Sequence, residues 1–510
     1  MMQRHKAILP ILILVIAIAA RWIPWTRTID DSYITFRYAR NILAGEGFVY
    51  NPGEPVMGTT TPLYTLLMVV SGAFSGGTEA SFPTLALFVN SLADAITALL
   101  LWQIGRHLKQ PLAGLAAALV WAILPYSVTF AIGGLETSLY VLLLTGAFYY
   151  YLTRRIFPAA FLGSLAILTR PDAIILLIPI AIDHLVRILR KQEKLRWQDI
   201  LALVLLPLIW YSFATLQFGS PIPHSVQAKL GAYRLDSTEA LVRLIQHFAT
   251  PFMNDQWFGS RIAVAGGMLL YPPLFAIGSL KAFKTNARTL PFILYPWLYL
   301  LVFAVANPLI FRWYLTPPLP AYLLFILIGI HTMVSVLLPR LKINANKLQT
   351  AILVLVLILL PLANLLSAWS WKPDHGLQHL APTMAWYELE LIYGKAADII
   401  SPYLQHGETL AAGDVGVLGY FTRARILDTV GLNSPEALDY YPLDKQAYVI
   451  NYAIAPDLII DQQPDAVIFL EVYGRNGLLK DKRFLEQYQL IRTLSTNIYG
   501  SNGMLIYVKR

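Results

Sequence analysis

Residues 30–64 read DDSYITFRYARNILAGEGFVYNPGEPVMGTTTPLY, and this polar stretch soon follows the first apolar run of the chain. That run covers Ala7–Ala20, so the adjacent carboxylates Asp30 and Asp31 stand just beyond the end of a hydrophobic helix. A carboxylate at a helix N-terminus contributes about 0.3–1 kcal/mol as a cap and dipole partner. A cap needs one acid, whereas an ionised Asp at a membrane surface also suits a general base for a hydroxyl nucleophile. Both roles stay open on local grounds.

The composition is that of a polytopic helical membrane protein. Of 510 residues, 56% are hydrophobic and 14% charged, and the mean hydropathy is +0.55. A soluble domain carries about 25% charged residues. Apolar runs of roughly 20 residues recur to about position 369, and this is the length of a membrane-spanning helix. The pattern excludes a disordered chain, a nucleic-acid-binding domain and an outer-membrane barrel, and the lack of cysteine excludes thiol nucleophiles and disulfides.

Basic clusters between the apolar runs set the expected topology, because cytoplasmic loops carry an excess of Lys and Arg. The net charge is +9, from 39 Lys+Arg against 30 Asp+Glu. Placing every cluster in the cytoplasm predicts about eleven spans, with the N-terminus inside and the C-terminus outside. The first run lacks a small-x-small cleavage site and is expected to be a retained signal anchor. The predicted spans are 7–25, 83–105, 111–131, 136–152, two short helices within 156–186, 199–217, 262–280, 289–306, 313–338 and 348–369.

Two long segments, 26–82 and 218–261, are expected on the outer side as loops of a membrane domain that covers 1–371. Residues 62–74 supply only thirteen positions between polar flanks. This is short for a hydrocarbon slab of ~30 Å, so an interfacial or re-entrant helix is expected there. Residues 239–248 predict an amphipathic helix in the second loop.

From about Lys372 the apolar runs shorten, and charged residues and Gly, Pro and Asn turns become frequent. Residues 372–510 therefore predict an extracytoplasmic domain of mixed α/β structure, attached to an otherwise all-α membrane protein. Helical spacing covers Trp386–Leu404, while Asp465–Val472 and Met504–Val508 are typical of strands. Residues 499–503, YGSNG, resemble a hairpin turn.

Several further stretches accompany the 30–64 motif in a fixed order. They are GGLETSLYVLLL from Gly133, LTRPDA from Leu168, FGSPIPHSVQAK from Phe218, FRWYLTPPLP from Phe311 and GDVGVLGYFTRARILDTVGLNSPE from Gly413. Together they resemble the GT-C superfamily of glycosyltransferases that use polyprenyl-phosphate sugars. The bacterial branch that includes the mycobacterial arabinofuranosyltransferases is the nearest likeness. The 30–64 motif is specific, and the other stretches are individually weak.

The resemblance implies a GT-C-like fold, a bacterial plasma membrane and an external C-terminal domain. It also implies transfer from a polyprenyl-phosphate sugar to a hydroxyl of a glycan, lipid or protein, with inversion at the sugar. In the superfamily an Asp of the first external loop is the catalytic base, which implies Asp30 as base and Asp31 as its orienting partner or acceptor contact. The assignment within the pair stays open. The family's PNT–AK stretch departs here to Pro223-His224-Ser225, so the role of its Asn is not transferred.

Other residues are candidates for substrate binding, each with an ordinary structural alternative. Arginine suits bidentate phosphate contact but also reaches lipid head groups from helix ends. A first-turn glutamate also serves a helix dipole, and tyrosines near a membrane also form aromatic belts. Asp414 and Asp428 of the outer domain are either acceptor contacts or turn formers. The substrate-binding candidates are Glu136, Arg170, His224, Lys229, Arg312, Tyr33 and Arg37.

Three functions remain open from the sequence. The first is glycosyl transfer, with an Asp base and cations at the departing phosphate. The second is a transporter or flippase of lipid-linked sugars, which would use ionisable groups within spans, such as Asp94 and His331. The third is a non-catalytic envelope-assembly protein. No cofactor is expected, and no His and acid cluster has the spacing of metal ligands, although a divalent metal stays open. The expected partners are the lipid-linked donor, the acceptor and membrane lipids, without nucleic acid.

The topology can be tested with fusion reporters. A reporter after Arg510 should report an extracytoplasmic position, and one inserted within Arg187–Arg196 should report a cytoplasmic position, because basic loops stay inside. Alkaline phosphatase and fluorescent protein fusions give opposite signals on the two sides. A cytoplasmic C-terminus would contradict the count of spans.

Overall fold

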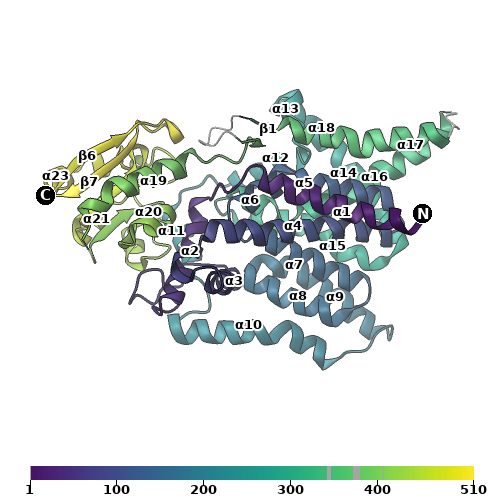
Figure 1. The fold of residues 1–510 in the computed structure, drawn as a ribbon, viewed down its shortest axis with the longest axis horizontal. Helices are drawn as coiled ribbons and strands as arrows, with labels where there is room; N and C mark the ends of the chain where they lie inside the picture. Colours follow the sequence, from purple (N-terminus) through teal and green to yellow (C-terminus); the bar gives the residue numbers. More distant parts are fainter. Residues whose placement is uncertain (1, 342–345, 372–378, 406) are drawn as a thin grey trace.

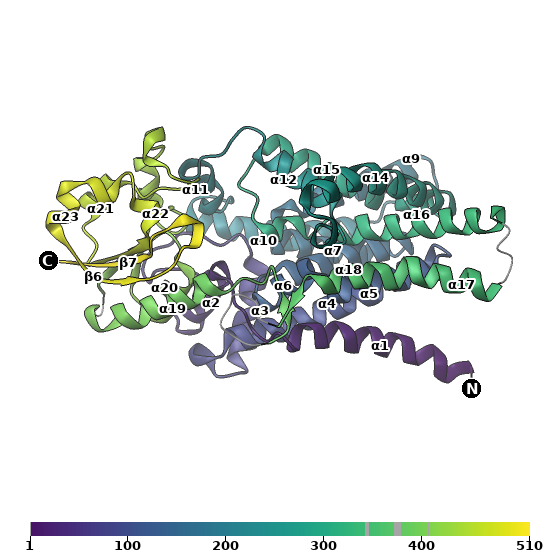
Figure 2. The same ribbon diagram turned by 90° about the horizontal axis from the view of Figure 1, so that it is seen from above.

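The computed structural model describes residues 2–341, 346–371, 379–405 and 407–510. The molecule is elongated, with a helical bundle at one end and an α/β domain at the other (Figure 1). The two chain ends lie at opposite ends of the molecule in both views (Figures 1 and 2). The expected fold class is therefore confirmed in outline: the bundle is helical, and the α/β structure is C-terminal.

A helix occupies each predicted span, because a helix satisfies its backbone polar groups within one segment. Among the described residues, six helices are long and apolar enough to cross a membrane, or seven if α5 and α6, bent by 42°, form one span. The total of eleven spans therefore stays a prediction. The bundle helices are α1 (Met2–Trp22), α4 (Phe82–His107), α5 (Pro111–Ile123), α6 (Pro125–Ile132), α7 (Thr137–Leu152), α8 (Ile156–Thr169), α9 (Ile174–Leu189), α10 (Trp197–Phe218), α14 (Ser260–Thr285), α15 (Leu290–Ala306), α16 (Leu319–Arg340), α17 (Asn346–Val354) and α18 (Leu360–Ser367).

The two loops that are predicted to be external also carry helices. The first loop contains α2 (Asp30–Leu43) and α3 (Pro62–Ala73), and α3 is a helix of 12 residues at the segment that was too short for a span. The second loop contains α11 (His224–Ala232), α12 (Glu239–Ala249) and α13 (Asp255–Phe258), and α12 matches the predicted amphipathic helix. Proline, which has no N–H to donate, marks the breaks between helices, at Pro125 after α5 and at Pro171 after α8.

Glycines let the central helices touch. A Cβ at Gly105 on α4 would lie 2.4 Å from Gly114 Cα on α5. A Cβ at Gly278 on α14 would lie 1.8 Å from the Phe325 carbonyl oxygen on α16. Small residues at helix contacts permit this close backbone approach in membranes, where dispersion contacts replace the hydrophobic driving force.

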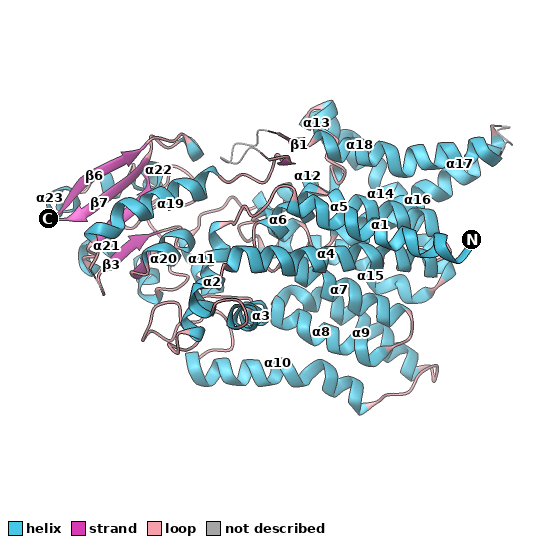
Figure 3. Ribbon diagram, viewed as in Figure 1, coloured by secondary structure: helices cyan, strands magenta, loops and turns pink. Residues whose placement is uncertain are grey.

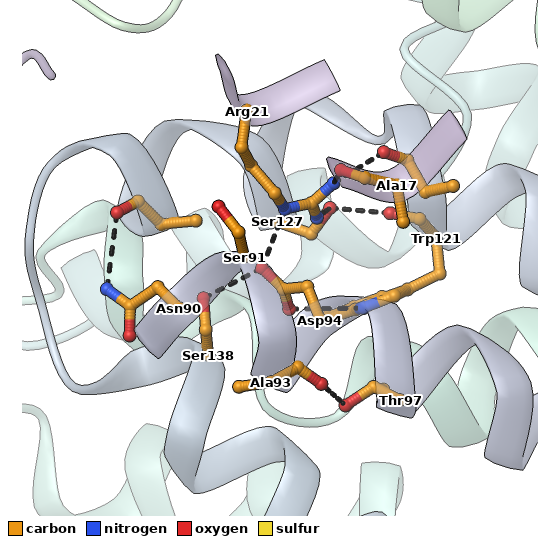
Figure 4. Close-up of polar contacts among 12 residues, drawn as sticks. Ala17, Arg21, Asn90, Ser91, Ala93, Asp94, Thr97, Trp121, Ser127 and Ser138 are labelled. Atoms are coloured by element: carbon orange, nitrogen blue, oxygen red, sulfur yellow. Dashed lines mark hydrogen bonds and ion pairs between the residues drawn. The ribbon is translucent and has the colours of Figure 1, made fainter. Parts of the chain in front are cut away.

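A fully buried ion pair lies at the contact of several helices of the bundle (Figure 4). Arg21 Nε on α1 donates to the Asp94 carboxylate on α4 at 3.0 Å, and neither side chain is exposed. Trp121 and Ser138 donate to the same carboxylate at 3.2 and 2.8 Å. Other Arg21 N–H groups donate to two backbone carbonyls and to the Ser127 hydroxyl. Asp94, which the sequence left open as a residue of a transport site, thus holds α1, α4, α5 and α7 together.

The C-terminal domain is built on a five-stranded sheet in the order β4-β3-β5-β7-β6 (Figure 3). β3 pairs in parallel with β4 and β5, while β7 pairs antiparallel with β5 and β6. The strands are β3 (Thr409–Ala412), β4 (Arg425–Asp428), β5 (Ala466–Leu470), β6 (Tyr488–Leu494) and β7 (Met504–Lys509). The helices are α19 (Glu388–Ile400), α20 (Gly416–Thr422), α21 (Pro456–Gln462), α22 (Glu471–Gly474) and α23 (Lys482–Gln487).

The sequence predictions for this domain hold in part. The predicted helix over 386–404 is α19, shorter at both ends, and the turn at 499–503 lies in the β6–β7 connection. β5 ends at Leu470 rather than 472, because Glu471 begins α22. β3, β4 and β6 were not predicted, since β3 and β4 have only four residues and β6 is an exposed edge strand. The predicted boundary at 371/372 adjoins residues 372–378, which lie outside the described ranges.

The buried pair predicts a large cost for removing one partner. Asp94→Ala leaves the Arg21 guanidinium uncompensated, so stability should fall by about 3–5 kcal/mol. The double variant Arg21→Met with Asp94→Leu should recover most of that loss, because no buried charge remains. Thermal unfolding in detergent, followed by size-exclusion chromatography, measures both. A single variant as stable as the wild type would show that the pair contributes little.

Candidate active site

Asp30 is the first residue of α2, but its carboxylate caps a different helix. Its two oxygens accept hydrogen bonds from the backbone N–H groups of Gly416 and Val417, at 2.8 and 2.7 Å, where α20 begins. A Cβ at Gly416 would lie 1.7 Å from the Asp30 carbonyl oxygen, so glycine is required. Burial, and then the neighbouring Asp414 carboxylate, raises the pKa of Asp30 well above its usual value. Asp30 therefore ties the first external loop to the C-terminal domain, and α2 and α20 lie side by side (Figures 1 and 2).

Asp31 is the neighbouring carboxylate without such a partner. Its side chain is half-buried and accepts no hydrogen bond from the residues that the structure describes. Burial raises the pKa of Asp31, and the ammonium of Lys229 opposes that rise. Lys229 lies on α11, and its Nζ is 5.0 Å from the centre of the Phe311 ring. The two long loops thus bring a carboxylate with open lone pairs near a cation.

Further charged residues extend from Lys229 into the helical bundle. Glu136, just before α7, acts electrostatically on Lys229 and lies 3.6 Å from Arg170. Arg170 donates from two nitrogens to both oxygens of Asp172, each at 3.0 Å, and its guanidinium lies 4.7 Å from the Tyr314 ring centre. Three predicted site residues, Glu136, Arg170 and Lys229, therefore belong to one network. Within it, Asp172 occupies the edge of the Arg170 guanidinium formed by Nε and Nη2, whereas Nη1 is buried without a hydrogen-bond partner among the described residues.

A cavity of about 800 Å³ lies between the bundle and the C-terminal domain. Its walls come from α6, from the segments 233–243 and 309–313, and from several parts of the C-terminal domain. Aromatic side chains, Trp313 and Trp386 among them, provide faces for a sugar ring, and arginines provide donors for phosphate. The charged lining residues are Arg27, Arg234, Arg243, Arg312, Asp236, Glu239, Glu390 and Asp414.

Two carboxyl groups of the C-terminal domain reach this cavity near Asp31. Asp414 precedes α20 and accepts a hydrogen bond of 2.5 Å from Tyr393, and burial raises the pKa of Asp414. Glu390 lies on α19, and burial, with repulsion from Asp414 and Asp31, raises the pKa of Glu390 to about 8. At neutral pH Glu390 is therefore mostly protonated and able to donate a hydrogen bond.

Solved structures share this arrangement of bundle and C-terminal domain. With ArnT from Cupriavidus metallidurans bound to undecaprenyl phosphate, the TM-score is 0.57 at 12% identity, over 98% of this chain and 97% of that chain. With the oligosaccharyltransferase of Archaeoglobus fulgidus it is 0.52 at 12% identity, over 98% of this chain and 73% of that chain. The chain has the GT-C glycosyltransferase fold.

Sequence relatives agree with the GT-C assignment. The terminal beta-(1->2)-arabinofuranosyltransferase of Mycobacterium tuberculosis is 30% identical over 281 residues, which are 50% of this chain and 43% of that protein. This chain thus matches less than half the length of that relative. The family model Domain of unknown function (DUF8728) matches residues 382–507, within the C-terminal domain. The resemblance to GT-C proteins that the motifs indicated is confirmed.

The remaining predicted site residues have different surroundings in this fold. Arg312 lines the cavity and donates to a backbone carbonyl at 3.4 Å. His224 begins α11, half-buried, and does not line the cavity. Tyr33 packs its ring against Tyr420 at 5.0 Å. Arg37 donates four hydrogen bonds, at 2.7–3.1 Å, to oxygens of the first loop and the C-terminal domain. Because the C-terminal domain covers α2, the side chains of Tyr33 and Arg37 stabilise the contact between α2 and that domain.

Some charged residues that line the cavity could not be predicted from the sequence. Glu390 stands within an ordinary helical pattern, and Arg243 within the amphipathic helix α12, so only the fold brings them to the cavity. Asp428 is a turn former and not an acceptor contact, because its carboxylate accepts hydrogen bonds from the backbone N–H groups of Val430, Gly431 and Asn433.

Metal ligands do not gather in the part of the chain that the structure describes. No group of three or more His, Asp or Glu side chains there has the geometry to hold a metal ion.

Glu390 predicts a pH-dependent stability. Its pKa of about 8 lies above the ordinary 4.5, so the folded protein keeps a proton that the unfolded chain releases across this window. The free energy of unfolding should therefore fall as the pH rises from about 5 to 8. Glu390→Gln is neutral at every pH and should reduce that fall, with each kcal/mol worth roughly 2–4 °C in melting temperature.

Thermal unfolding at pH 5.5 and 8.5 measures the effect, and the control Glu388→Gln changes a residue on the same helix that does not line the cavity. The control should show the same change with pH as the wild type. An unchanged pH dependence in Glu390→Gln would contradict the buried, protonated state of this group.

Proposed function

We propose that the protein is a membrane glycosyltransferase that moves a sugar from a polyprenyl-phosphate donor to a hydroxyl group of a cell-envelope glycan, lipid or protein. The observation that carries this proposal is Asp31, a carboxylate without a hydrogen-bond partner in the described chain, placed near Lys229. Asp31 also acts on Tyr233 and Glu390, which both line the cavity. The GT-C fold and the partial match to an arabinofuranosyltransferase support the same activity.

In the proposed step Asp31 accepts the proton of the acceptor hydroxyl, whose oxygen then forms a bond to the anomeric carbon of the sugar. The bond from that carbon to the phosphate oxygen breaks, and its electron pair leaves with the polyprenyl phosphate. A single displacement inverts the anomeric centre. Asp31 suits this role better than Asp30, because the oxygens of Asp30 already accept two backbone N–H bonds.

Lys229 is the cation that we assign to the departing phosphate, since it lies near Asp31 and an ammonium stabilises the charge that develops there. Arg170 is a positioning residue in this scheme, because Asp172 holds one edge of its guanidinium and Glu136 lies between it and Lys229 in the charge network. Arg312 lines the cavity and is exposed, so it remains available for a phosphate or a head group.

We place the reaction at the outer face of a bacterial plasma membrane, with residues 1–371 as the membrane domain and 372–510 outside. The N-terminus is then cytoplasmic. The candidate site lies where the external loops meet the C-terminal domain, at the end of the bundle opposite the N-terminus (Figure 1). A lipid-linked donor reaches such a site from the membrane, and a soluble acceptor reaches it from outside.

A transporter or flippase of lipid-linked sugars, or a non-catalytic assembly protein, is the alternative. Transport needs ionisable groups that exchange partners within the spans. Asp94 does not favour it, because Arg21, Trp121 and Ser138 occupy its carboxylate in a fully buried pair.

Substitutions in the Asp pair separate the two roles. Asp31→Asn removes the base and should lower turnover by about 10²–10⁴-fold without loss of donor binding. Asp30→Asn loses one charge-assisted hydrogen bond, so it should cost about 1.5–3 kcal/mol of stability. The activity of Asp30→Asn should then follow its folded fraction.

Transfer from radiolabelled polyprenyl-phosphate sugars by the purified protein measures turnover, and thermal unfolding measures stability. A stable Asp30→Asn protein without turnover, beside an active Asp31→Asn protein, would move the base to Asp30. Normal turnover in both variants would overturn the proposed chemistry.

A further inference from the structure

A second cavity, of about 450 Å³, lies among membrane helices. Its walls come from α13 and α14 on one side and from the α17–α18 helix on the other, and α13 lies beside α18 (Figure 3). Apolar side chains make up most of its lining, with Ile262, Leu270, Val356 and Leu360 among them. We call this cavity the α14–α18 groove.

The α14–α18 groove borders surface that faces membrane hydrocarbon. Both of its long walls, α14 and the α17–α18 helix, are long and apolar enough to cross a membrane. Four of its lining residues are large, apolar and exposed: Phe258 at 58%, Ile262 at 69%, Leu270 at 50% and Leu360 at 51%. Apolar side chains exposed on a membrane span contact lipid chains. A hydrocarbon chain is therefore the material that surrounds this groove.

The helices on either side leave room for a guest. Residues 355–359 form a π-helical turn before Pro361, whose missing N–H cannot complete the regular ladder. Val356 of that turn lines the groove. On α14, no described atom outside the adjacent turns of the helix itself lies within 4 Å of the place where a Cβ of Gly266 would be, so this space is open.

A polar acceptor at the groove lacks a donor. Asn364 lines the groove near the end of α18, and its Oδ1 is buried without a hydrogen-bond partner among the described residues. Buried polar atoms in proteins are nearly always bonded, so the Asn364 oxygen points to a ligand that carries an N–H or O–H group.

We propose that the α14–α18 groove holds one acyl chain of a bilayer phospholipid whose head group donates a hydrogen bond to Asn364. An ethanolamine head group carries such a donor together with a cation for its own phosphate, and choline carries no donor. The groove has no Lys or Arg among its described lining residues, whereas four arginines line the cavity at the C-terminal domain. A polyprenyl phosphate is therefore less suited to the groove, because its phosphate requires a cation.

Filling the groove tests its occupant. Gly266→Phe places a ring in the open space, and Gly266→Ala, which adds only a Cβ there, is the matched control. The full chain is delipidated in detergent and titrated with dioleoyl phosphatidylethanolamine, with native mass spectrometry as the readout. The wild type and Gly266→Ala should bind one lipid with equal affinity. Gly266→Phe should bind at least ~10-fold more weakly, because each buried methylene contributes about fourfold.

Asn364→Leu tests the head-group contact independently of the chain. The wild type should prefer phosphatidylethanolamine to phosphatidylcholine by roughly two- to tenfold, the strength of one hydrogen bond, and the variant should bind both equally. Unchanged lipid binding by folded Gly266→Phe, or an unchanged preference in Asn364→Leu, would overturn the proposal. So would binding of undecaprenyl phosphate that Gly266→Phe abolishes, at a concentration where the phospholipid does not bind, because this result would assign the groove to the glycosyl donor.

Discussion

The contact of the Asp30 carboxylate with the first N–H groups of α20 is the interaction on which the site depends. It joins residues 386 positions apart, and it brings together two parts of the chain that otherwise belong to different domains. Arg37 extends the contact by donating to the Gly419 and Ala424 carbonyls. Because these bonds fix α2 against the C-terminal domain, Asp31 is held near Lys229 and beside residues of the cavity.

Two kinds of buried charge can be told apart by whether their hydrogen-bonding capacity is used. Arg21 and Asp94 satisfy each other with help from Trp121, Ser127 and Ser138, so this pair is structural. Asp31 has unused lone pairs, and its cation lies on a different loop. A charged group whose hydrogen bonds are all made within the protein serves to position helices. A charged group with unused hydrogen-bonding capacity near a cavity is available to a substrate.

The sequence predicts the helices well and the site incompletely, for physical reasons. Apolar runs of a fixed length mark each span, because the hydrocarbon slab imposes that length on any chain. The motif at 30–64 locates the carboxylate pair, but local sequence cannot say which member is open, since Gly416 and Val417 lie far along the chain. For the same reason the sequence alone makes Arg37 a candidate phosphate ligand. The backbone carbonyls to which it donates belong to the C-terminal domain and lie far along the chain.

The union of α2 with α20 also bears on how such a protein is made. A ribosome releases Asp30 early, and the N–H groups that will pair with it emerge only after the whole bundle has been synthesised. Until residues 416 and 417 have been synthesised, the Asp30 carboxylate has no partner from α20. The nascent chain therefore carries an incomplete contact between α2 and α20 until the C-terminal domain has folded.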